Sequence, residues 1–78
     1  MDKRRKEAKH KLQEATLEEY EAAIKAAKLT PRQAEVIDYI IIQDEFEVKI
    51  ARLMSTDISV VKRLAQKAYD KLAKVLLV

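Results

Sequence analysis

The chain has 78 residues with no Cys, no Gly and one Pro, and this length predicts one small domain. The lack of cysteine excludes disulfides and thiolate metal sites, and a single histidine cannot build a metal cluster, so we expect no metal or other cofactor. No apolar run approaches the roughly 20 residues of a membrane-spanning helix. We therefore expect no membrane segment and a cytoplasmic location.

Charged side chains are unevenly distributed along the chain. Residues 1–11 carry six basic and two acidic residues, residues 12–47 carry three and nine, and residues 48–78 carry seven and two. Basic ends around an acidic middle predict one face that attracts a polyanion such as nucleic acid and another face turned away from it.

The composition is rich in helix-forming residues and indicates an all-α fold with short connections. We expect a four-helix domain over residues 16–78. The basic residues 1–15 ahead of it are expected to be a disordered arm or an extension of the first helix.

Two threonines mark the first two helices. Thr16 and Thr30 are each followed three residues later by Glu or Gln, the capping-box pattern, and a proline directly follows Thr30. These signals predict one helix over about 16–28 and a second over about 31–42.

A third, short helix is expected to end near Met54. Asp44 with Glu47 is the predicted cap, and Phe46 or Val48 is the predicted inward position ahead of Ile50 and Ala51.

The polar residues 55–57 separate this helix from the last one. Asp57 is a suitable cap for a helix that begins at residue 58 and continues to about residue 75. Residues 58–72 of this helix are its predicted recognition segment. Its predicted inward residues are Val61, Leu64, Ala65, Ala68 and Leu72.

Residues 29–72, 44 of the 78, carry a family resemblance. Leu29-Thr30-Pro31-Arg32-Gln33, followed by Glu35-Val36-Ile37, resembles the helix entry of LuxR-type and sigma-factor region 4 domains. The turn and recognition helix of that family are matched in spacing by Ile50-Ala51, Met54, Asp57, Val61-Lys62, Ala68 and Lys71-Leu72, with one extra residue between the two halves. The resemblance implies a helix-turn-helix domain that binds double-stranded DNA sequence-specifically. Because no sensing domain is attached, we expect a transcriptional regulator of the repressor or copy-control type, associated with the nucleoid.

Three features depart from the family pattern. Ser55 stands where the family usually has Gly, and Thr56 stands where an aliphatic residue normally fills the turn. Asp44, Glu45 and Glu47 lie where related domains often touch a phosphate, so their charge puts that contact in doubt.

A final helix in the major groove would present its outward side chains to the bases. The predicted base-reading residues are Ser59, Lys62, Arg63 and Gln66. The predicted phosphate-binding residues are Lys49, Arg52, Thr56, Lys67 and Lys71. The alternative is a solvated basic helix face without a ligand.

The basic run at the N-terminus is interpreted in two ways. Lys3, Arg4, Arg5 and Lys6 either follow phosphates or enter a minor groove, or they form a solubilising tail. His10 is expected to be an exposed polar residue.

The apolar end of the chain also allows two arrangements. Leu72, Val75 and Leu76 either fold back on the first helix of the domain or pair with a second copy. We favour a homodimer, whose two recognition helices would lie about 34–36 Å apart on a palindromic site.

Two other classes of function are weighed against DNA binding. Region 4 domains of sigma factors also bind RNA polymerase, and the acidic middle of the chain suits a basic protein surface. An enzyme is disfavoured because the sequence has no Cys or metal constellation and no glycine-rich phosphate loop, and because its acid pairs fall at exposed helical spacing without a pocket. We therefore expect no small-molecule substrate.

Overall fold

The computed structural model describes residues 2–78 and is all-helical over that range. Five helices follow one another with short connections: α1 (Lys3–Glu14), α2 (Leu17–Ala26), α3 (Pro31–Ile41), α4 (Glu47–Leu53) and α5 (Ile58–Leu76). None of them combines the length and the apolar character that a bilayer-spanning helix requires.

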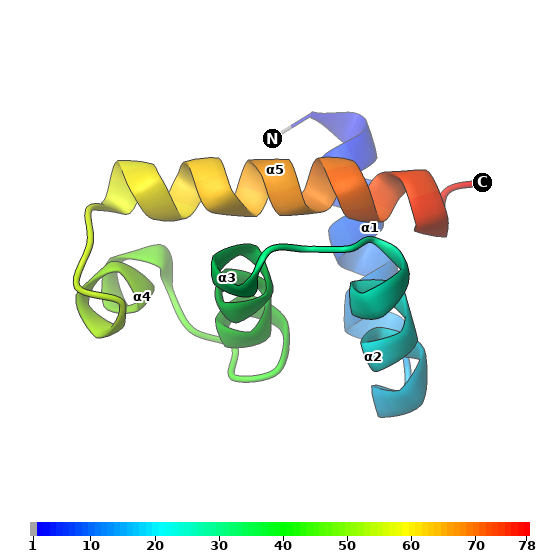
Figure 1. Ribbon diagram of the computed structural model, residues 1–78, viewed down its shortest axis with the longest axis horizontal. Coiled ribbons are helices and arrows are strands. Elements are labelled where there is room, and N and C mark those ends of the chain that lie inside the picture. The colour runs from blue at the N-terminus through cyan, green and yellow to red at the C-terminus, as the bar shows by residue number, and fades with distance from the viewer. Residues whose placement is uncertain (1) are drawn as a thin grey trace.

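The fold is organised around α5, which contacts all four other helices. Figure 1 shows α5 along the length of the molecule, with α2, α3 and α4 on one side of it and α1 crossing it. With 19 residues at about 1.5 Å each, α5 extends along most of the 33 Å longest dimension. One helix therefore supplies the surface against which the others pack.

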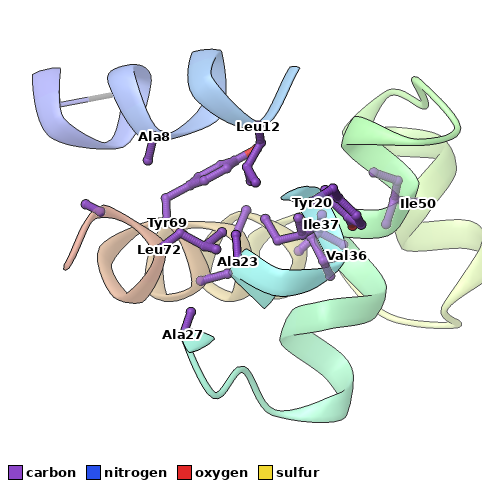
Figure 2. Close-up of a cluster of buried hydrophobic side chains, with 14 of the residues drawn as sticks. Ala8, Leu12, Tyr20, Ala23, Ala27, Val36, Ile37, Ile50, Tyr69 and Leu72 are labelled. Carbon is purple, nitrogen blue, oxygen red and sulfur yellow. The ribbon is translucent and has the colours of Figure 1, made fainter. Parts of the chain in front are cut away.

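A single apolar core joins the helices. Figure 2 shows Val36 and Ile37 of α3 next to Ala23 of α2, and the ring of Tyr69 extending from α5 toward Leu12 of α1. The predicted inward positions of the last helix are all buried or half-buried. The largest fully buried side chains are Tyr69, Leu12, Ile37, Ile50, Leu72, Val36 and Val61.

The prediction of a disordered arm or helix extension at the N-terminus is wrong. Residues 3–14 form a helix of their own, capped by Asp2, whose carboxylate accepts a hydrogen bond from the Arg5 amide at 3.2 Å. The chain leaves the helical conformation at Ala15 and Thr16, so α1 does not continue into α2. Ala8 and Leu12, one turn apart, are buried. Residues 2–78 therefore form five helices, not four.

Both predicted capping boxes are present. The Thr16 hydroxyl accepts from the Glu19 amide at 3.2 Å, and the Glu19 carboxylate accepts from the Thr16 amide at 2.8 Å. Thr30 and Gln33 make the same reciprocal pair at 3.2 and 3.1 Å, with Pro31 in the first position of α3. These bonds satisfy amides that have no partner within the helix.

The predicted start of the third helix is wrong. Phe46, not Asp44, occupies the cap position of α4, and no side chain caps this helix. Asp44 has a φ of 54°, in the left-handed region, and so belongs to the preceding turn. Phe46 is 81% exposed and Val48 is 58% exposed, so neither of them is the inward residue.

Candidate nucleic-acid interface

The turn between α4 and α5 is a Schellman motif built without glycine. The Thr56 amide donates to the Ala51 carbonyl at 2.9 Å, and the Ser55 amide donates to the Arg52 carbonyl at 3.2 Å. Ser55 adopts a φ of 54°, so the departure from the family's glycine leaves a left-handed residue with a side chain at the turn.

Buried apolar contacts hold α4 against α5. Ile50 of α4 and Val61 of α5 are both completely buried, and Ala51 is buried beside the turn. Asp57 occupies the N-cap position of α5, but its side chain makes no capping hydrogen bond. The entry of α5 is therefore fixed by packing and by the turn. The Val60 and Val61 amides donate to the Asp57 carbonyl, and among the described residues the Ile58 and Ser59 amides have no acceptor.

The four predicted base-reading residues share one face of α5. Ser59, Lys62, Arg63 and Gln66 stand at positions i, i+3, i+4 and i+7, and all four are exposed. Among residues 2–78 none of their side chains makes a hydrogen bond or ion pair. This stripe of free donors, which we call the reading face, lies opposite the buried stripe that contains Val61 and Leu72.

The reading face ends at an ion pair with α1. Asp70 follows Gln66 by one turn on the same stripe, and its carboxylate accepts from Arg5 Nε at 2.8 Å and Nη2 at 3.1 Å. The hydrogen bonds from the Arg5 guanidinium lower the pKa of Asp70. Asp70 is the single acid between Ile58 and Val78, and Arg5 neutralises it.

This ion pair also fixes the position of the N-terminal basic residues. The ion pair between Arg5 and Asp70 holds the start of α1 against α5. The neighbours of Arg5 on α1, Lys3, Arg4 and Lys6, are therefore held near α5, and all three are exposed. Figure 1 shows the N-terminal end of α1 beside α5. The predicted arm is thus a structured part of the surface. Arg5 has an internal partner, whereas the side chains of Lys3, Arg4 and Lys6 make no hydrogen bond or ion pair within the described residues.

The predicted phosphate-binding residues fall into two groups. Arg52 and Lys67 are exposed and unpaired within the described chain, and Lys49 is exposed with a weak pair to Glu45 at 3.3 Å. Thr56 and Lys71 are half-buried, and Lys71 Nζ donates to Gln33 Oε1 of α3 at 2.9 Å. Lys71 therefore links α5 to the capping box of α3.

The acids ahead of α4 are only partly neutralised. Glu45 pairs with Lys49, whereas Asp44 and Glu47 are exposed. Burial is the main reason that the pKa of Tyr69 on α5 is raised, and the nearby Glu47 carboxylate is the second reason. The negative charge at the start of α4 keeps a phosphate contact there unfavourable.

Residues outside this surface have local roles. His10 is exposed, as expected, with Nε2 3.0 Å from Glu14 Oε1 one turn away. Nowhere in the described chain do three His, Cys, Asp or Glu side chains gather to hold a metal ion. The Tyr69 hydroxyl is buried without a hydrogen-bond partner among the described residues.

Of the C-terminal apolar residues, most pack within the chain. Leu72 is completely buried and Leu76 packs against the core, next to residues from the end of α1. Val75 and Val78 remain exposed.

Two contacts at this surface were not foreseen from the sequence: Arg5 with Asp70 and Lys71 with Gln33. Both join residues more than 35 positions apart. Asp70 is exposed, so its residue type and its position gave no signal that it would bind Arg5.

Comparison with protein-family models, with curated proteins and with solved structures gives no match to this chain.

Proposed function

We propose that this protein is a sequence-specific regulator of transcription that binds double-stranded DNA, with the first half of α5 in the major groove. The observation that carries the proposal is the reading face: four exposed, unpaired polar side chains on one stripe that begins at the entry of the helix. A major groove admits one helix with this presentation.

The chemistry of the reading face suits base edges. Lys62 and Arg63 can donate to guanine O6 and N7, and the Gln66 amide can pair with adenine N6 and N7. Ser59 can donate to or accept from either base. Around this stripe, Arg52 and Lys67 together with the exposed cations of α1 are suited to phosphates, which fix register without reading sequence.

Two copies on a palindromic site are part of the proposal. Val75 and Val78 are the C-terminal apolar side chains left exposed by the fold, so they are the ones available to a partner. A two-fold pair would repeat the site after one helical turn, about 34–36 Å.

Selection of bound duplexes from a random pool, followed by titration of variants, tests the proposal. Against the selected site, the double variant Lys62→Ala with Arg63→Ala should lose about 2–6 kcal/mol, roughly 30-fold or more, because two base contacts are removed. Affinity for unrelated duplex should fall much less. A palindrome among the selected sites would support the two-copy arrangement.

The matched control is Lys25→Ala with Arg32→Ala, which removes the same charge from exposed positions on α2 and α3. This variant should keep its preference for the selected site. Circular dichroism checks that both variants stay helical. If the Lys62 and Arg63 variant discriminates between sites as well as the unmodified protein does, α5 does not read the bases.

A further inference from the structure

An open groove lies between α2 and α3, away from the proposed DNA-binding surface. Its volume is about 930 Å³. Its lining consists of Glu18, Tyr20, Glu21, Ala22, Ile24 and Lys25 of α2, Lys28 and Leu29 of the following turn, and Ala34, Glu35 and Asp38 of α3. No residue of α1, α4 or α5 lines it. The groove therefore does not overlap the reading face.

The floor of the groove is apolar. Ile24 and Leu29 are half-buried and pack against the core, and both line the groove. Ala34 of α3, also half-buried, extends this apolar lining to the second helix. Tyr20 closes the floor between the two helices, where its hydroxyl donates to Asp38 Oδ1 at 3.3 Å. Burial and the neighbouring Asp38 carboxylate raise the pKa of Tyr20, so the phenol stays protonated.

Each wall of the groove carries two carboxylates one turn apart. Glu18 and Glu21 lie on α2, and Glu35 and Asp38 lie on α3. Within residues 2–78 none of these four acids belongs to a salt bridge. The two cations of the lining are Lys25, in the last turn of α2, and Lys28, in the turn that follows it. The groove therefore has an excess of two negative charges, four acids against two lysines.

We propose that this groove binds an amphipathic helix of a partner protein, one whose apolar stripe is flanked by Arg or Lys. The stripe would cover Ile24, Leu29 and Ala34, and the flanking cations would reach the carboxylates on both walls. The wall from Glu18 to Ala26 extends about 12 Å along the axis of α2, slightly more than two turns of a helix.

Other occupants fit the groove less well. A small molecule needs a site that encloses most of its surface, and this groove is open to solvent. Duplex DNA would face uncompensated carboxylates. A second copy offers no continuous apolar stripe on a long helix, because the exposed apolar side chains of its basic helices are Val48 and Leu53 on the seven-residue α4 and Ile58 and Val75 near opposite ends of α5.

A titration with two synthetic peptides of roughly 18 residues, five helical turns, tests the proposal. Both peptides carry the same leucine stripe, flanked by Arg in one and by Glu in the other. The Arg-flanked peptide should bind the full chain at least about tenfold more tightly than the Glu-flanked one, and should shift the amide NMR signals of Ala22, Ile24 and Ala34. Equal affinity for the two peptides would overturn the proposal, and so would shifts confined to α4 and α5.

Charge reversal locates the binding surface. Glu21→Lys with Glu35→Lys changes one exposed acid on each wall and should weaken the Arg-flanked peptide at least about tenfold. The control, Glu7→Lys with Glu14→Lys, makes the same change on exposed positions of α1 and should leave the affinity within about twofold. Equal weakening by both variants would mean general attraction to net charge and would refute the groove. No DNA is needed in this titration, so its outcome is independent of the proposed regulatory function.

Discussion

The two halves of α5 use the same residue types for different purposes. From residue 58 to residue 67 the polar side chains of the helix are exposed and make no hydrogen bond or ion pair within the described chain, whereas in the second half Asp70 and Lys71 bind Arg5 and Gln33. The second half also contains the buried Tyr69 and Leu72. Cations with an internal partner hold the helices together, and cations without one are available for a ligand.

The largest expected effect comes from the structural half. Leu72→Ala removes a completely buried side chain and should lower the free energy of unfolding by about 2–5 kcal/mol, a large part of the stability of a small domain. Lys62→Ala, on the exposed half, should change it by no more than about 0.5 kcal/mol. Urea unfolding followed by circular dichroism measures both. Similar losses for the two variants would end the division of α5 into a structural and an exposed half.

A smaller effect, with the opposite sign, is expected at the turn that leads into the exposed half. Ser55→Gly should stabilise the fold by about 0.5–1 kcal/mol, because glycine adopts a positive φ without the steric penalty of a Cβ. Ser59→Gly is the matched control inside α5, where φ is helical, and it should not raise stability. Thermal or urea unfolding compares the two variants. Stabilisation by both, or by neither, would show that Ser55 is not strained.

Local signals in the sequence were enough to predict much of the fold. The capping boxes at Thr16 and Thr30 fixed two helix starts to the residue because both partners lie within one turn of each other. The outward and inward faces of α5 followed from helical periodicity.

What the sequence did not reveal depends on distant contacts. The burial of α1 rests on Ala8 and Leu12 alone, a single apolar pair that is too weak a pattern to distinguish a docked helix from a tail. Asp44 was a plausible cap by residue type, but the chain turns there in the left-handed region, which Asp tolerates well. The pairing of Arg5 with Asp70 spans 65 positions, and no local rule predicts it.

The central claim is that the unpaired cations of α5 and α1 bind duplex DNA, and the salt dependence of affinity tests it most directly. With about six phosphate contacts, log K should fall with log salt at a slope near −5. Substituting alanine for Lys3, Arg4 and Lys6 leaves Ala8 and Leu12 in the core and should reduce the slope by up to about 2.7, at roughly 0.9 per contact. If no duplex is retained even at low ionic strength, the claim is wrong; an unchanged slope in the triple variant would remove α1 from the interface.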